Sequence, residues 1–185
     1  MKFNVKKTTL FMILTCFIGF GLYAQSDNFI KEQDKEKLVI DAKYALKSLM
    51  ESNQEVGEIA DDSYGYVIFP NVGKGAFIAG GAAGNGVVYK GGEQVGWAKL
   101  RQVDVGLQIG GEAFIEAIFF QTRQDLEEFQ SGELEFTGAV SAVIVKEGGS
   151  KSVNFEDGMA VVLKTKGGAM LEISVGGQKF SYRDK

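Results

Sequence analysis

Basic side chains occur near glycine-rich turns in the middle of the chain, and aromatic residues are interleaved with them. The basic residues are Lys74, Lys90, Lys99 and Arg101, and the aromatic ones are Phe69, Phe77, Tyr89 and Trp97. Ammonium and guanidinium groups hold phosphate oxygens through charge-assisted hydrogen bonds, and apolar side chains beside them can contact an acyl chain. On a curved sheet, this set is suited to an anionic lipid headgroup. The alternative is that the phenylalanines fill a core and the lysines keep loops soluble.

Most catalytic chemistry lacks its usual residues in this chain. There is no histidine, and the only cysteine is Cys16. These absences exclude histidine-based triads, cysteine nucleophiles downstream of Cys16 and Cys/His zinc sites. The segment around Lys74 lacks the spacing of a phosphate-binding loop. We therefore expect no catalytic residue, no cofactor and no nucleotide.

Carboxylates give no convincing acid pair or metal site. Glu112 and Glu116 would lie about 13 Å apart on one face of a continuous strand, which is wider than the acid pairs of glycosidases. Asp61, Asp62 and Asn71 lack the spacing of a calcium loop. We expect no metal site, with a carboxylate-dependent metalloenzyme as a remote alternative.

The first 24 residues predict a secretory signal. Three lysines precede an apolar run from Leu10 to Tyr23, which is too short to span a bilayer as a helix, and Ala24 precedes a suitable cleavage point. We expect export to the periplasm or cell envelope, with a lipoprotein anchor at Cys16 or an uncleaved membrane anchor as alternatives.

The whole chain has 20 basic and 24 acidic side chains. Removal of the three leader lysines leaves 17 against 24, a net charge of −7, which argues against nucleic-acid binding.

Two segments have helical signals. From Asp27 to Asn53, apolar residues recur at intervals of three and four, opposite a charged face. This amphipathic helix either packs on its own domain, which we favour, or binds a membrane or partner. A short helix is predicted near 123–130, with Thr122 as its N-cap and Gly132 after its end.

From Tyr64 onward, the hydrophobic period changes to two, which is typical of strands. Gly-Gly pairs separate many of the apolar runs, and the pair at 91–92 suits a hairpin turn that needs positive φ. We expect a single α+β domain over residues 25–185, built on a mostly antiparallel, curled, barrel-like sheet with the first helix packed against it. The predicted strands are 66–69, 76–79, 86–89, 103–110, 113–120, 139–145, 159–163 and 169–176.

Residues 60–89 resemble the signature of the SYLF domain family. A strand ending in Phe69-Pro70 leads through a Gly-Lys turn into a Gly-Gly-x-x-Gly segment. Gly96-Trp97, the block at 106–111 and the helix and strand at 125–136 resemble later family motifs, so that the likeness spans about 38–182. The chain departs from the family pattern at 98–100 and at 164–167.

The resemblance implies binding of membrane phospholipid. Eukaryotic members bind phosphoinositides, and some also bind actin beside an SH3 domain, which is absent here. For this chain we expect non-enzymatic binding of anionic phospholipid or lipid-like headgroups at an envelope membrane. Lys74, Lys99 and Arg101 would supply charge, and Phe77 and Trp97 would supply apolar contact. The alternative is an envelope structural or protein-interaction module that uses its sheet surface or first helix.

Overall fold

The computed structural model describes residues 30–73, 81–103, 113–132, 134–136, 141–146, 152–167 and 177–185. The predicted secretory signal, Cys16 and the predicted strands at 76–79 and 169–176 lie outside these residues. Most of the predicted strand at 103–110 also lies outside them. None of the described helices combines the length and the apolar composition needed to cross a membrane.

The first predicted helix is confirmed as α2, Glu32–Ser52, which packs on its own domain. Ala42, Ala45 and Leu49 form its buried stripe. A second helix that the sequence analysis did not predict, α3 (Glu55–Asp62), follows at once. The break lies at Asn53, whose extended backbone ends α2 and whose side-chain oxygen accepts a 3.0 Å hydrogen bond from the backbone N–H of Glu55. Asn53 therefore satisfies one of the N–H groups that the start of α3 leaves free.

The described strands form one curled sheet, so the expected α+β fold is confirmed. Its strand order is β5-β8-β3-β2-β1-β4-β7-β6. Every neighbouring pair is antiparallel except β6 with β7. The sequence analysis did not predict β3 or β8 over their observed lengths. The strands are β1 (Gly65–Val72), β2 (Gly81–Lys90), β3 (Glu93–Val103), β4 (Phe114–Phe120), β5 (Glu135–Phe136), β6 (Ala142–Ile144), β7 (Met159–Thr165) and β8 (Gln178–Asp184).

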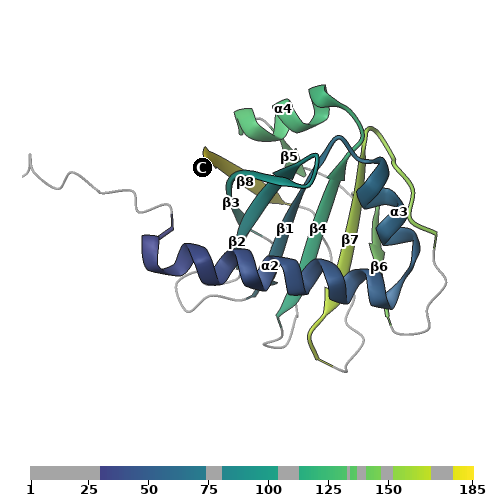
Figure 1. Ribbon diagram of the computed structural model, residues 1–185, viewed down its shortest axis with the longest axis horizontal. Helices are drawn as coiled ribbons and strands as arrows, with labels where there is room; N and C mark the ends of the chain where they lie inside the picture. The colour runs from purple at the N-terminus through teal and green to yellow at the C-terminus, as the bar shows by residue number, and fades with distance from the viewer. Residues whose placement is uncertain are drawn as a thin grey trace, which may run out of the picture.

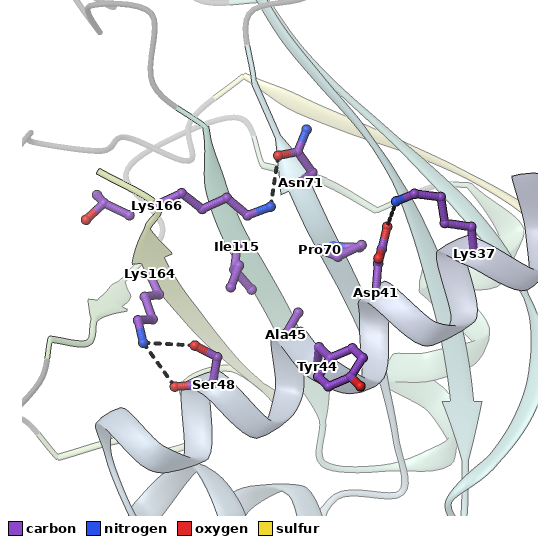
Figure 2. A pocket seen from close by; sticks show the side chains of 11 residues that line it. Lys37, Asp41, Tyr44, Ala45, Ser48, Pro70, Asn71, Ile115, Lys164 and Lys166 are labelled. Carbon is purple, nitrogen blue, oxygen red and sulfur yellow. Dashed lines mark hydrogen bonds and ion pairs between the residues drawn. The ribbon is translucent and has the colours of Figure 1, made fainter. Parts of the chain in front are cut away.

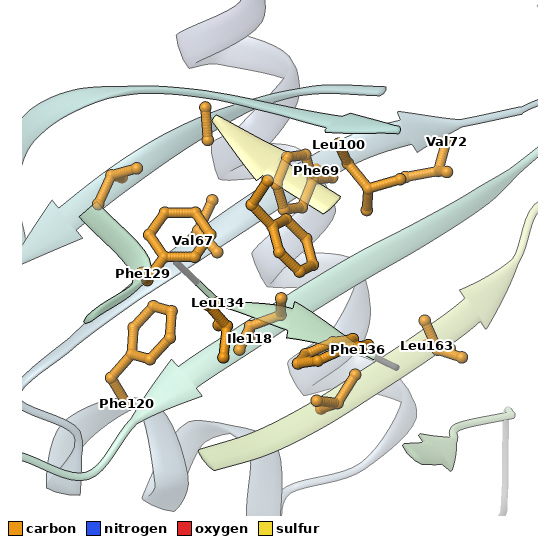
Figure 3. Packing of buried hydrophobic residues seen from close by; sticks show 14 of the residues in the cluster. Val67, Phe69, Val72, Leu100, Ile118, Phe120, Phe129, Leu134, Phe136 and Leu163 are labelled. Carbon is orange, nitrogen blue, oxygen red and sulfur yellow. The ribbon is translucent and has the colours of Figure 1, made fainter. Parts of the chain in front are cut away.

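The sheet is buried on both faces. The outer face is the one that α2 crosses (Figure 1), and Ile68, Phe119 and Val162 pack there with the buried stripe of the helix. The inner face carries a second apolar cluster that includes Val67 and Ile118 (Figure 3). Successive residues of a strand point to opposite faces, so the central strands need apolar residues at most of their odd and even positions. All seven residues of β4 are buried accordingly.

The curl of the sheet brings distant strands together across the inner face. Phe180 of β8 lies 6.0 Å from Phe69 of β1 between ring centroids, although β3 and β2 separate these strands in the sheet. Phe180 also contacts Phe136 of β5, at 5.1 Å, and Phe129, at 5.4 Å. The described sheet is therefore a half-barrel whose interior is filled by aromatic side chains.

The helix α4 (Arg123–Ser131) packs at one end of this interior (Figure 1) and confirms the predicted short helix. Thr122 and Asp125 form a reciprocal capping box at its start, and Gly132 ends it in the left-handed conformation. Gly91 and Gly92 have φ values of 55° and 80° in the β2–β3 hairpin, as predicted. The capping and turn residues predicted from the sequence thus occupy the predicted positions in the fold.

Replacing Phe129 tests the aromatic interior. Phe129 is fully buried and contacts both Phe120 and Phe180. We expect Phe129→Ala to lower the free energy of unfolding by about 3–5 kcal/mol, because it removes buried apolar contacts and leaves a cavity. Denaturant unfolding measures this change. The exposed neighbour Glu128 is the matched control, and Glu128→Ala should change stability by less than about 0.5 kcal/mol. Equal effects of the two substitutions would contradict the packing described here.

Candidate functional site

A groove lies between α2 and the neighbouring ends of β1, β4 and β7 (Figure 2). Its volume is about 620 Å³, which lies within the range of small-molecule sites. The lining is mostly polar and basic on the side of β7 and apolar at the floor. The residues that line it are Lys37, Asp41, Tyr44, Ala45, Ser48, Pro70, Asn71, Ile115, Lys164, Thr165 and Lys166.

Two lysines of the groove come from the end of β7 and its continuation. Lys164 and Lys166 are two residues apart, so that an extended chain directs both to the same face. Lys164 Nζ donates to Ser48 Oγ at 2.9 Å and to the Ser48 carbonyl oxygen at 3.2 Å. Lys166 Nζ donates to Asn71 Oδ1 at 3.0 Å. Both ammonium groups are therefore held in place by neutral oxygens, and neither forms an ion pair with a carboxylate of the described residues.

The remaining charges of the groove come from α2. Lys37 and Asp41 lie one helical turn apart and form an ion pair with each other. The described residues of the groove lining thus supply three ammonium groups and one carboxylate, and that carboxylate is paired with Lys37. The whole chain carries a formal net charge of −4. The groove is consequently a local basic site on an acidic protein.

The floor of the groove is apolar because it belongs to the outer face of the sheet. Pro70 and Ile115 contribute side chains from β1 and β4, and Ala45 contributes from α2 (Figure 2). The β1–β4 register shifts between Phe69 and Val72. Proline has no N–H to donate to a neighbouring strand, and irregularities of this kind are where a sheet accommodates it. Tyr44 stands at the rim with 70% of its surface exposed.

Ser48 and Lys164 are the residue types of a serine–lysine catalytic dyad, and they lie within hydrogen-bond distance of each other. Catalysis of that kind uses the lysine as a base that removes the serine proton. Here Lys164 Nζ donates to two oxygens of Ser48, one of them the backbone carbonyl. This arrangement uses the lysine as a donor, as an anion-binding ammonium does.

Three of the five predicted site residues lie in the described part of the chain, on β3. Trp97, Lys99 and Arg101 alternate along the strand and share the outer face of the sheet, whereas Lys74 and Phe77 lie outside the described residues. In the register, Arg101 is opposite Lys179 of β8. Lys179 in turn pairs with Glu135 at 2.8 Å. Lys99, Arg101 and Lys179 thus lie near one another on the outer face, with the charge of Lys179 offset by Glu135, and we call these three residues the β3–β8 basic patch.

Trp97 does not lie on an open surface. Only 5% of it is exposed, and it packs in the outer apolar cluster beneath α2. Lys35 Nζ of α2 lies 5.4 Å from the centroid of its ring, within the range of a cation–π contact. Trp97 therefore helps to hold α2 on the sheet. A direct contact between this ring and a lipid would require α2 to move.

The β3–β8 basic patch and the groove are separate sites on one face. Between β3 and β7 lie β2, β1 and β4. Four strand spacings correspond to about 19 Å along the sheet.

The sequence analysis did not assign Lys37, Lys164 or Lys166 to a site. The spacing of Lys164 and Lys166 directly after a predicted strand was the available signal, whereas their partners on α2 and β1 depend on tertiary structure.

No metal centre is found in the part of the chain that the structure describes. It contains no cluster of three or more acidic, cysteine or histidine side chains suited to a metal ion. Of the residues considered for calcium, Asn71 uses its side-chain oxygen to accept from Lys166. An ammonium group thus lies where a calcium ion would need that oxygen.

The fluorescence of Trp97 tests the position of α2, because Trp97 is the only tryptophan in the chain. We expect aqueous iodide to quench it far less in the folded protein than in the denaturant-unfolded protein, since the ring is covered. Anionic vesicles should leave the emission maximum unchanged if lipid binds in the groove. A shift of the maximum on vesicle addition would instead indicate that α2 leaves the sheet and that Trp97 contacts lipid.

Comparison with protein-family models and with curated proteins gives no match for this chain. The resemblance to the SYLF domain therefore stays a prediction from the motifs quoted above. The charges and geometry of the chain's own residues favour an anionic ligand. On that basis, the groove beneath α2 is the candidate anion-binding site.

Proposed function

We propose that the chain is a non-enzymatic binding protein that holds the phosphate of an anionic phospholipid or lipid-like headgroup in the groove beneath α2. The observation that carries this proposal is the state of Lys164 and Lys166. Their ammonium groups are held by Ser48 and Asn71, which are neutral. An ordered cation without a carboxylate partner is the kind of group that phosphate oxygens bind.

Charge favours an anion in the groove over the rest of the surface. Two unit charges 4 Å apart attract by roughly 4 kcal/mol in the partly screened environment near a protein surface. Lys164, near the end of β7, and Lys166, directly after it, both line the groove and would both contribute positive potential to an anion held there. Asp41 reduces the positive potential, but its own ion pair with Lys37 limits that effect.

Apolar residues beside the groove are suited to the part of a lipid next to its headgroup. Tyr44 is 70% exposed and Ile40, one turn earlier on α2, is 53% exposed. Large apolar side chains at a basic surface are typical of helices that lie at a membrane interface. We therefore propose that α2 faces the membrane while the headgroup lies in the groove.

The β3–β8 basic patch supports the same orientation. Lys99 and Arg101 belong to the outer face of the sheet, which is also the face of the groove. A surface with two basic regions on one face is attracted to an anionic bilayer more strongly than to a single soluble phosphate. Binding at an envelope membrane, and the export that it requires, remain part of this proposal.

A second candidate function is an envelope protein-interaction module. Ile40, Tyr44 and Met50 are large apolar side chains that α2 leaves exposed, and such side chains also occur in protein interfaces. This candidate predicts partner capture that depends on Ile40 and Tyr44 and is indifferent to the charge of Lys164 and Lys166.

Vesicle co-sedimentation tests the lipid proposal. We expect the protein, with its leader removed, to bind vesicles of phosphatidylglycerol and not vesicles of phosphatidylcholine. The double variant Lys164→Gln/Lys166→Gln should weaken binding by about tenfold or more, because a hydrogen bond to a charged group contributes about 1.5–3 kcal/mol. Binding should also weaken as salt increases.

The matched control removes the same charge from the same protein outside the groove. Lys43 and Lys47 are exposed on α2 and do not line the groove. Lys43→Gln/Lys47→Gln should reduce binding much less than the groove variant. Equal reductions would mean that binding follows net charge and not the groove. Absence of binding to any anionic vesicle would overturn the proposed function.

A further inference from the structure

Three polar side chains are buried in the interior of the half-barrel, among the aromatic and aliphatic residues of its inner face. Glu116 comes from β4, Gln102 from β3 and Gln178 from β8, and each has 0% of its surface exposed. A buried acidic side chain without a charged partner is costly. The role of this cluster does not depend on the function proposed above.

Glu116 and Gln178 connect two strands that are not neighbours in the sheet. Gln178 Nε2 donates to Glu116 Oε2 at 2.9 Å and lies 3.4 Å from Gln102 Oε1. Three strands, β3, β2 and β1, separate β8 from β4. In a flat sheet, four strand spacings would place them about 19 Å apart. The hydrogen bond therefore crosses the interior of the curl and joins its two walls.

Glu116 and Gln178 each have one side-chain oxygen that accepts no hydrogen bond from the described residues. These oxygens, Glu116 Oε1 and Gln178 Oε1, are both buried. If Glu116 were ionised, an anionic oxygen and an amide oxygen would both be buried without donors. If Glu116 carries a proton, its hydroxyl becomes a donor and the amide oxygen of Gln178 can accept from it. A single proton on Glu116 thus gives both buried oxygens a hydrogen bond.

The surroundings of Glu116 also favour the neutral acid. Its cross-strand neighbours are Phe69 of β1 and Leu163 of β7, and Phe114 and Ile118 flank it on the same face of β4. Gln102 and Gln178 face it from β3 and β8. Among the described residues of these five strands, no charged side chain faces Glu116. Burial raises the pKa of Glu116 to about 8, against the lowering effect of the Gln178 hydrogen bond.

We propose that Glu116 is a neutral acid in the folded protein at pH 7 and that its proton closes a contact with Gln178 that holds the two walls of the half-barrel together. Ionisation of Glu116 removes the donor of this second contact and leaves a buried anion, whereas the hydrogen bond from Gln178 Nε2 remains. The half-barrel therefore contains a proton-dependent contact, which we call the closure, between Glu116 of β4 and Gln178 of β8.

The closure makes stability depend on pH with a definite sign. In the unfolded chain Glu116 ionises near its ordinary pKa of 4.5, whereas in the folded chain it keeps its proton up to a pKa of about 8. Between these values the folded state binds more protons than the unfolded state. Stability consequently falls as pH rises through this window, and above about pH 8 this group causes no further fall.

Infrared spectroscopy of the folded wild-type protein tests the protonation state directly. We expect a band of a protonated carboxyl group at pH 6 and 7 that disappears with a midpoint near pH 8 and is absent in Glu116→Gln. The variant Gln178→Leu should shift the frequency of this band, because it removes the hydrogen-bond partner. If the wild-type protein lacks the band at pH 6, Glu116 is ionised and the proposal is overturned.

Hydrogen exchange tests whether the proton closes the structure. Protection factors of the β8 amides should fall between pH 5 and pH 8 in the wild-type protein and level off above pH 8, whereas Glu116→Gln should keep them constant because an amide cannot ionise. The matched control Glu128→Gln changes an exposed glutamate of α4 and should behave as the wild type. Equal pH dependence in the wild type and Glu116→Gln would overturn the proposal. If Glu116→Gln does not fold, constant wild-type protection between pH 5 and pH 8 would overturn it equally.

Discussion

The central strands β1 and β4 lie between two apolar layers, one on each face of the sheet. The rest of the structure depends on which elements cover these two faces. α2 covers the outer face, and the curl of the sheet with α4 covers the inner face. Because the side chains of a strand alternate between faces, neither layer can form without fixing the register of the other. β4 is buried at all seven positions, and Glu116 is its one ionisable residue.

The sequence was sufficient for those parts of the fold that local patterns determine. The stripe of α2, the capping residues of α4 and the glycines of the β2–β3 turn act through neighbours in the chain. β3 and β8 escaped prediction because their buried inward positions include the polar Gln102 and Gln178, while the apolar Trp97 lies among the outward positions. A pattern of this kind does not separate core from surface. α3 was missed because it is a single short helix before a strand.

The candidate site was less predictable than the fold for a physical reason. Lys164 and Ser48 are 116 residues apart in the chain, and only the docking of α2 brings them together. The sequence analysis weighted glycine-turn lysines and the tryptophan, and Trp97 proved to be buried beneath the helix. Lys99 and Arg101 lie on one face of β3, but the sequence analysis grouped them as basic residues near glycine turns and did not predict the strand that aligns them.

The walls of the groove belong to two elements, α2 and the sheet, that meet through side chains. A molecule that fills the groove would touch both elements, so its binding energy would be added to the energy that keeps α2 in place. By mass action, occupancy would raise the midpoint of thermal unfolding as ligand concentration rises. Conversely, a substitution that loosens α2 anywhere along its length would weaken affinity without touching a single groove residue.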